Sequence, residues 1–317
     1  MTKIALLDDY QNIALKMSDW SLLPEKTSVE VFSDHIENTD KLIERLIGFE
    51  VVCAMRERTP FPENILKSLP NLKLLVTTGM RNASIDVAAA VKLGVTVCGT
   101  GGLPYPTAEL TWGLVLDLAR NISTEYNSTR QGKWQTTMGV GLKGKTLGVL
   151  GLGNLGSQVA NYGKAFGMNI ISWSQNLTEE KAHEHGVTLV SLDTLMSDSD
   201  FLSIHTTLSS RTRGLINKSK LRLMKPTAYL VNTSRGPIVN ESDLIEVLEN
   251  KEIAGAALDV FDNEPLRRDH SFMELNNVIM TPHIGYVTKE TYELFYRETM
   301  ECVMAFMAGD PIRVIGK

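Results

Sequence analysis

Three residues with strong chemical potential, Arg235, Glu264 and His283, each come shortly after a short apolar run in this 317-residue chain. These residue types bind anions, orient a neighbouring imidazole and transfer protons. In an open parallel sheet, the residues beyond the carboxyl ends of the strands line the ligand crevice. If the apolar runs are strands of one sheet, the arginine, the acid and the histidine converge at a single site although they lie far apart in sequence.

A second chemical pattern is the segment GLGNLG, which begins at Gly151, directly follows an apolar run and opens a helical stretch. In a dinucleotide-binding loop, Gly151 would permit the tight turn, Gly153 would let the backbone approach a pyrophosphate, and Gly156 would let the helix pack on the strand. The amides of Asn154 and Leu155 would face the phosphates at the start of the helix. The segment therefore predicts a dinucleotide site.

The next strand ends at the segment WSQN, where dinucleotide sites usually carry an acid that binds the ribose hydroxyls. Ser174 stands in this region and no acid is present, so a 2′-phosphate would meet no repulsion. No arginine follows the strand in sequence either, and the nearest cation is Lys181. The predicted cofactor is therefore NAD or NADP, with both alternatives open.

The overall composition is that of a globular protein, with 43% hydrophobic residues and a formal charge of −5. Without a basic block, nucleic acid is not an expected partner, because that binding depends on many Lys and Arg residues. The uncharged run 146–163 contains five glycines and is no membrane span. Cys53, Cys98 and Cys302 lie in apolar stretches without metal-ligand spacing. We therefore expect free thiols, no metal site, no membrane partner and a cytoplasmic protein.

Short apolar runs that alternate with helical patterns must position these residues. The expected strands of a first series are residues 4–7, 29–32, 51–53, 72–77 and 95–97. Those of a second series are residues 146–150, 169–173, 188–189, 201–204, 228–231, 254–258 and 278–280. Strands joined by crossover helices form parallel, doubly wound sheets, so two α/β domains are predicted.

Two long helical patterns flank the second series, over residues 106–131 and 289–308. We expect each to be one continuous helix, and the pair are candidates for crossing between the two domains. The C-terminal segment would then return to the first domain, which would be discontinuous. The glycine loop itself is expected to lead into a helix over residues 157–166.

The segments GLGNLG, NTSRGPIVNE, DVFDNEP and TPHIGY, in this order, resemble the D-specific 2-hydroxyacid dehydrogenase family. The segments HTTLSSRTRGLI and TTGMRNASID are similar to the family as well. The resemblance implies two doubly wound parallel-sheet domains with a cleft between them. A flavodoxin-like substrate domain would comprise residues 1–100 and 287–317, and a Rossmann dinucleotide-binding domain residues 101–286. It also implies a homodimer packed through the cofactor domain, with the long helix after Pro106 as a candidate contact.

The resemblance implies roles for the three strand-end residues in the interconversion of a D-2-hydroxy acid and its 2-oxo acid. Arg235 would hold the carboxylate and carbonyl oxygen, for which its planar fork is suited. His283 would be the acid in reduction and the base in oxidation, and Glu264 would orient it. Hydride transfer belongs to the nicotinamide.

The remaining site positions are also carried over from the family. Asp259 would meet the carboxamide of the cofactor. The other positions implied to contact the cofactor, besides the glycine loop, are Ser174, His205, Thr206, Thr233, Arg235, His283 and Gly285. Those implied to contact the substrate are Arg56, Gly79, Met80 and Arg235.

One alternative belongs to another functional class. A nicotinamide-sensing binding protein, such as a corepressor of the same fold, can retain the arginine, the glutamate and the histidine. Oxidation of reduced cofactor with 2-oxo acids would favour the dehydrogenase, and no oxidation with any of them would favour the sensor.

Overall fold

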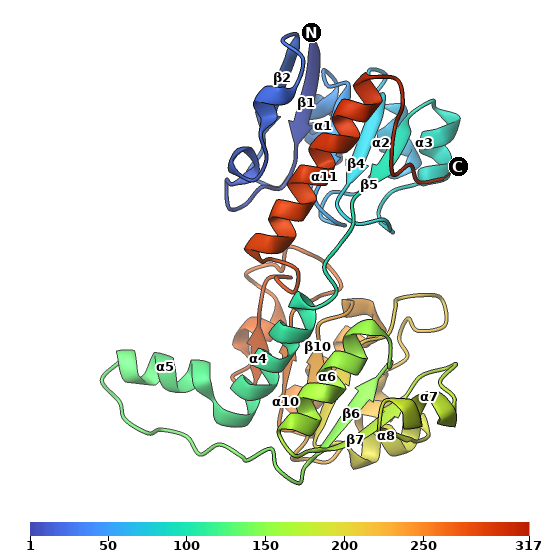
Figure 1. The fold of residues 1–317 in the computed structure, drawn as a ribbon. Coiled ribbons are helices and arrows are strands. Elements are labelled where there is room, and N and C mark those ends of the chain that lie inside the picture. Colours follow the sequence, from blue (N-terminus) through green and yellow to red (C-terminus); the bar gives the residue numbers. More distant parts are fainter. Residues whose placement is uncertain (317) are drawn as a thin grey trace. The chain divides into compact units, whose positions relative to one another are not determined.

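Residues 1–316 are described by a computed structural model in which the chain forms two α/β units (Figure 1). Unit 1 consists of Met1–Leu103 and the segment from Val287 onward, and unit 2 consists of Pro104–Tyr286. The chain passes from unit 1 to unit 2 after Leu103 and returns after Tyr286. Unit 1 is thus assembled from both ends of the sequence.

Unit 1 contains a five-stranded parallel sheet with the strand order β2-β1-β3-β4-β5. Its strands are β1 (Thr2–Leu6), β2 (Thr27–Val31), β3 (Val51–Ala54), β4 (Leu74–Thr77) and β5 (Thr96–Gly99). Its helices are α1 (Thr39–Leu46), α2 (Glu63–Lys67), α3 (Val87–Lys92) and α11 (Lys289–Met307), with 3₁₀ turns at Ala14–Lys16 and Trp20–Leu22. The order is that of flavodoxin-like sheets, which confirms the predicted class of this part.

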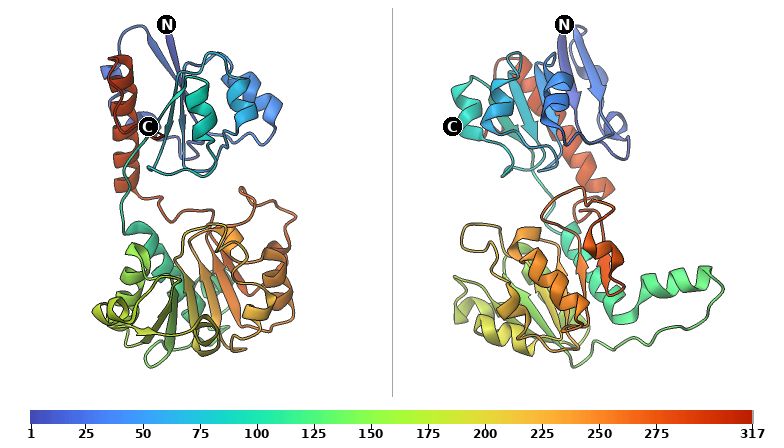
Figure 2. Two further views of the ribbon diagram at one scale, coloured as in Figure 1. Left: turned by 90° about the vertical axis from the view of Figure 1, so that its right-hand side faces the viewer. Right: turned by 180° about the vertical axis from the view of Figure 1, so that it is seen from behind.

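Both faces of this sheet are covered, which explains why its inner strands β3 and β4 read as continuous apolar runs. Helices α1, α2 and α3 lie on one face and α11 lies on the other (Figure 2). Every residue of β3 and β4 is buried. Leu42 and Leu46 of α1 pack with Val52 and Leu75 of the sheet in one apolar cluster. A strand buried on both faces shows no polar alternation.

Unit 2 contains a seven-stranded parallel sheet with the order β12-β11-β10-β9-β6-β7-β8. Its strands are β6 (Thr146–Leu150), β7 (Asn169–Trp173), β8 (Thr188–Leu189), β9 (Phe201–Ile204), β10 (Tyr229–Asn232), β11 (Gly255–Leu258) and β12 (Val278–Met280). Its helices are α4 (Pro106–Arg120), α5 (Ile122–Arg130), α6 (Asn154–Ala165), α7 (Glu179–Glu184), α8 (Leu192–Asp198), α9 (Lys218–Leu221) and α10 (Glu241–Glu249), with 3₁₀ turns at Gly236–Ile238 and Ser271–Glu274. The strand order reverses between β9 and β6, as in the Rossmann fold, so the predicted class is confirmed here too.

Successive residues of the central strands of unit 2 serve two different cores. Phe201 and Val231 pack in a cluster with α4 and α6. Their neighbours Leu202 and Leu230 point the opposite way, into a cluster with α8 and α10. Side chains alternate between the two faces of a strand, so two helical layers need apolar residues at every position.

The prediction of one helix over residues 106–131 is wrong. Asn121 separates α4 from α5 and has φ 53° and ψ 40°, a left-handed conformation that breaks the helical hydrogen-bond ladder. Asparagine tolerates this region better than most residues. The expectation that the long helices cross between domains is also wrong, because α4 lies within unit 2 and α11 within unit 1.

Two further properties concern the described part of the chain as a whole. No helix of residues 1–316 combines the length and apolar character needed to cross a membrane. Within the same residues, no group of three or more His, Cys, Asp or Glu side chains is arranged to hold a metal ion. All three cysteines are buried and none forms a disulfide.

Candidate active site

The glycine loop of unit 2 follows β6 and lies between the ends of β7 and β9, the two strands that neighbour β6 in the sheet. The amide of Gly151 donates to the carbonyl of Trp173 at the end of β7 (2.8 Å). On the other side, a Cβ on Gly151 would lie 2.9 Å from the carbonyl of His205, which follows β9. Gly151 also has φ +98°, which L side chains rarely adopt. The turn therefore needs glycine at this position.

Helix α6 begins at Asn154, three residues earlier than predicted, because its first turn includes the last part of the glycine motif. Its N-cap, Gly153, has no side chain to occupy the first amides, and a Cβ there would meet nothing within 4 Å. At Gly156, in contrast, a Cβ would lie 1.9 Å from the carbonyl oxygen of Gly151. Open space before an uncapped helix start suits an anion, so these residues fit the pyrophosphate of a dinucleotide.

Arg235 sits on a turn after β10 that Asn232 holds in shape. Asn232 is buried, its Nδ2 donates to the carbonyl of Arg235 (2.9 Å), and its Oδ1 accepts from the amide of Ser234 (3.0 Å). Nη1 of Arg235 in turn donates to the carbonyl of Ser234 (2.7 Å). The sequence prediction missed Asn232, although asparagine at the end of a strand is a known signal of such turns.

The turn that carries Arg235 lies directly against the loops on either side. A Cβ on Gly236 would lie 2.2 Å from the carbonyl carbon of Phe261, so the loop after β11 touches this turn. Ser234 Oγ donates to the carbonyl of Thr206 in the loop after β9 (2.6 Å). Thr233 is buried and its hydroxyl hydrogen-bonds Thr111 of α4 (2.7 Å). The predicted position Thr233 is therefore engaged by the protein itself.

The structure brings His283 and Glu264 into direct contact. Nδ1 of His283 lies 2.5 Å from Oε2 of Glu264, and Oε1 of Glu264 accepts from the amide of Phe261 (2.9 Å). Both side chains are partly exposed, at 19% for the histidine and 29% for the glutamate. The rings of Tyr286 and His283 pack in a T-shaped arrangement, with 5.7 Å between their centroids. The glutamate thus fixes the orientation of the imidazole while the ring stays accessible.

Asp259 holds the loop on which His283 sits. Its carboxylate is buried and accepts from Thr281 Oγ1 (2.6 Å) and from the amides of Ile284 (2.8 Å) and Gly285 (2.9 Å). Burial raises the pKa of Asp259, whereas these hydrogen bonds oppose the rise by favouring the charged form. The clamp surrounds a strained residue, because His283 has φ +53°.

His205 is half-buried beside the glycine loop. Its Nε2 lies 2.7 Å from the hydroxyl of Ser203, and burial lowers its pKa to about 4. The imidazole is therefore neutral at neutral pH. It can share a hydrogen bond but brings no positive charge to a phosphate.

The predicted substrate residues of unit 1 also lie together. Arg56 follows β3, its Nη1 donates to the carbonyl of Thr78 (3.1 Å), and a Cβ on Gly79 would lie 2.0 Å from that Nη1. The amide of Gly79 already donates to Thr100 Oγ1 (2.8 Å). Met80 is partly exposed. The half-buried Arg56 and the exposed Met80 are therefore the residues of this cluster that a ligand could reach.

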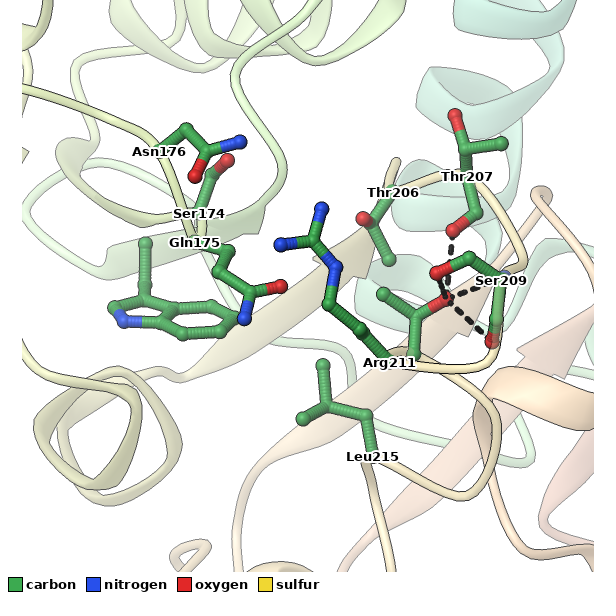
Figure 3. A pocket seen from close by; sticks show the side chains of 10 residues that line it. Ser174, Gln175, Asn176, Thr206, Thr207, Ser209, Arg211 and Leu215 are labelled. Atoms are coloured by element: carbon green, nitrogen blue, oxygen red, sulfur yellow. Dashed lines mark hydrogen bonds between the residues drawn. The ribbon is translucent and has the colours of Figure 1, made fainter.

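A pocket of about 280 Å³ lies beside the glycine loop, and the sequence prediction named Ser174 and Thr206 among its lining residues but missed Arg211. Ser174, Gln175 and Asn176 at the end of β7 form one wall, and the loop after β9, including Thr206 and Arg211, forms the other (Figure 3). Arg211 is distant from Ser174 in sequence, so only the fold reveals that they share a pocket.

The predicted residues of unit 2 are divided along one edge of its sheet. Groups that suit a dinucleotide follow β6, β7 and β9, whereas Arg235, Glu264 and His283 follow β10, β11 and β12. Because these strands are parallel neighbours, all their carboxyl ends lie at the same edge. The arrangement can bind a dinucleotide and present an oriented imidazole and a guanidinium next to it.

Comparison with known proteins gives the same picture. Residues 112–285 match the family described as D-isomer specific 2-hydroxyacid dehydrogenase, NAD binding domain. A glyoxylate reductase from Aeropyrum pernix is 41% identical over 256 residues, which cover 78% of this chain and 76% of that protein. A D-3-phosphoglycerate dehydrogenase from Methanocaldococcus jannaschii is 37% identical over 314 residues, which cover 98% of this chain but only 58% of that longer protein.

A solved structure matches nearly the whole chain. The crystal structure of a phosphoglycerate oxidoreductase from Vibrio cholerae o395 has a TM-score of 0.93 and 38% sequence identity, and the match covers 98% of this chain and 100% of the other. Together with the NAD-binding family match, this establishes an oxidoreductase that uses a nicotinamide cofactor, NAD or NADP. The chain belongs to the D-isomer specific 2-hydroxyacid dehydrogenase family.

Proposed function

We propose that the enzyme interconverts a D-2-hydroxy acid and its 2-oxo acid, with His283 as the acid–base residue. The observation that carries this proposal is the 2.5 Å contact between Nδ1 of His283 and Oε2 of Glu264. With Nδ1 engaged, Nε2 is the ring nitrogen that can exchange a proton with a substrate. No hydrogen bond within residues 1–316 occupies Nε2.

The three residues have distinct tasks in this proposal. His283 donates a proton from Nε2 to the carbonyl oxygen during reduction and accepts it from the hydroxyl during oxidation. Glu264 accepts a hydrogen bond from Nδ1–H of His283 and so keeps the proton on that nitrogen. It also stabilises the positive charge of the ring when both nitrogens are protonated. The nicotinamide, when bound, supplies or accepts the hydride.

Arg235 is proposed to hold the substrate carboxylate. A guanidinium offers two parallel N–H donors that match a carboxylate, and a lysine cannot reproduce this fork. The turn around Asn232 supports the assignment, because it fixes the backbone from which the side chain extends. Glycine-loop amides in the same unit are proposed to hold the pyrophosphate of the cofactor.

Unit 2 is thus proposed as the dinucleotide-binding domain and unit 1 as the substrate domain. In unit 1, the Arg56 guanidinium beside Gly79 supports this role, since it gives an anionic substrate a cation near the exposed residue Met80. We infer that Arg56 and the backbone amide of Met80 bind the carboxylate or a polar substituent of the acid.

The test replaces His283 by Ala and measures both turnover and cofactor binding. General acid–base catalysis contributes about 10²–10⁴-fold, so we expect turnover with glyoxylate, hydroxypyruvate and larger 2-oxo acids to fall by at least a hundredfold. Binding of reduced cofactor, followed by fluorescence titration, should stay within threefold. His183→Ala, on α7 away from the strand ends, is the matched control. Turnover of the His283 variant within tenfold of the parent would contradict the assignment.

We further propose that unit 2 forms a homodimer through α5 and the segment that follows it. Figure 1 shows α5 extending away from the sheet of unit 2 as an arm. The arm exposes Ile122, Tyr126, Trp134 and Met138, with Trp134 at 79% and Met138 at 93%. Exposed apolar groups that gather in one segment usually mark an interface. Sedimentation should show a dimer that the double variant Tyr126→Ser with Trp134→Ser weakens, and a monomeric parent would refute this.

A further inference from the structure

The pocket beside the glycine loop borders the part of the dinucleotide that lies beyond the pyrophosphate. The hydrogen bond from the Gly151 amide to the carbonyl of Trp173 ties the loop to the end of β7. The close approach of Gly151 to His205 ties it to the start of the other wall. A dinucleotide whose pyrophosphate lies at the start of α6 therefore has this pocket next to one of its riboses. In Rossmann folds, the end of the second strand reads the adenosine ribose.

The wall contributed by β7 contains neutral groups that can donate hydrogen bonds. Ser174 provides a hydroxyl, and Gln175 and Asn176 provide side-chain amides. An acid in this place would accept hydrogen bonds from the two ribose hydroxyls and would repel a phosphate. No Asp or Glu is present among the residues that line the pocket. This wall therefore tolerates a 2′-phosphate.

The opposite wall contributes a positive charge. The guanidinium of Arg211 points from the loop after β9 into the space between Gln175 and Thr206 (Figure 3). Arg211 is exposed, and within residues 1–316 no carboxylate forms an ion pair with it. A guanidinium that faces neutral donors across an open pocket is suited to a phosphate, to which it can donate two parallel hydrogen bonds.

We propose that Arg211 and Ser174 bind the 2′-phosphate of NADP(H), and that the enzyme prefers NADPH to NADH. Lys181, which sequence reasoning identified as the nearest cation, does not line this pocket. The inference rests on the proposed function, because it assigns the choice of cofactor to the same site. It adds a specificity-determining residue that follows β9 instead of β7.

The direct test is binding rather than turnover. Calorimetric titrations measure the Kd of NADPH, NADH, 2′,5′-ADP and 5′-AMP for the parent, Arg211→Gln and Ser174→Asp. We expect the parent to bind NADPH at least tenfold more tightly than NADH, and 2′,5′-ADP more tightly than 5′-AMP. Arg211→Gln should weaken NADPH and 2′,5′-ADP by ten- to a hundredfold and change NADH by less than threefold. Ser174→Asp should reverse the preference.

Arg213→Gln is the matched control, because Arg213 is an exposed arginine of the same loop that does not line the pocket. This variant should keep the parent's Kd values within twofold. Equal Kd values for NADPH and NADH in the parent would overturn the proposal. An equal loss of affinity for NADPH and NADH in Arg211→Gln would also overturn it, because this result would indicate a contact with the adenine or the ribose that both cofactors share.

The titrations also separate this inference from the proposed reaction. If the parent prefers NADPH in binding but reduces no 2-oxo acid, the cofactor assignment stands and the proposed function fails. If it reduces 2-oxo acids with equal Kd values for the two cofactors, the proposed function stands and the role of Arg211 fails.

Discussion

Replacing Asp259 by Asn tests whether a buried clamp determines the position of His283. The carboxylate accepts three hydrogen bonds, from Thr281, Ile284 and Gly285, and all three donors flank the histidine in one short loop. Asparagine has nearly the same shape but only one oxygen. It can keep the two donors that meet Oδ1, and its amide group then faces the N–H of Gly285.

The size of the expected loss of activity follows from the unfavourable contact between the asparagine amide group and the N–H of Gly285. A hydrogen bond to a charged acceptor contributes about 1.5–3 kcal/mol, and an unsatisfied buried donor costs a similar amount. Part of the loss is offset because a neutral side chain is easier to bury, as the raised pKa of Asp259 indicates. A net loss of about 2 kcal/mol in the free energy that holds the loop in place remains. If the loop then leaves its productive position, and the barrier of the reaction rises by this amount, kcat falls about thirtyfold.

The assay compares kcat and urea unfolding of Asp259→Asn with those of Asp262→Asn. Asp262 is exposed in the loop after β11, and no hydrogen bond to its carboxylate occurs within residues 1–316, so its replacement changes charge without removing a clamp. We expect only Asp259→Asn to lose activity. A kcat within twofold of the parent, with an unchanged unfolding midpoint, would show that Asp259 does not position His283.

Two further predictions concern the guanidinium of Arg235 and the half-buried imidazole of His205. Arg235→Lys keeps the charge but loses the fork, so kcat/KM for 2-oxo acids should fall about a hundredfold, while the Kd of the cofactor should not change; an equal loss in both would contradict substrate binding by Arg235. His205 has a folded-state pKa of about 4, below its ordinary value of about 6.5. Its contribution to stability is therefore complete above about pH 6.5 and is lost as the pH falls toward 4, by at most about 3 kcal/mol. His205→Asn should unfold in urea with a flatter acid dependence, and an unchanged slope would contradict this.

The class of fold and the order of the site along the chain could be predicted from the sequence because both depend on local signals. An apolar run such as residues 201–204 predicts a buried strand whatever its neighbours in the sheet are. The same residues also show where the carboxyl end of that strand lies. Arg235, Glu264 and His283 each follow such an end. Once the strands are parallel, their ends share an edge, and no distance between the residues is needed to expect them there.

Other features depend on contacts that sequence spacing does not encode. The break at Asn121 interrupts a pattern that continues on both sides of it, so helical periodicity gives no warning of a left-handed residue. Arg211 follows a different strand from Ser174, and it enters the pocket beside the glycine loop only because β9 and β7 both neighbour β6. Searching only the residues just after β7 for a cation therefore missed it.

The formal charge of −5 gives these local cations their importance. The cofactor and the 2-oxo acid are both anions, so the long-range field of the protein does not attract either of them. Binding must then come from donors at short range, for which we propose the uncapped amides of α6, Arg235 and Arg211. A 2′-phosphate increases the charge of the cofactor and so increases its need for such a donor. The proposed preference for NADPH therefore rests on two features of one pocket, the missing ribose-binding acid and a cation, Arg211, with no ion-pair partner within residues 1–316.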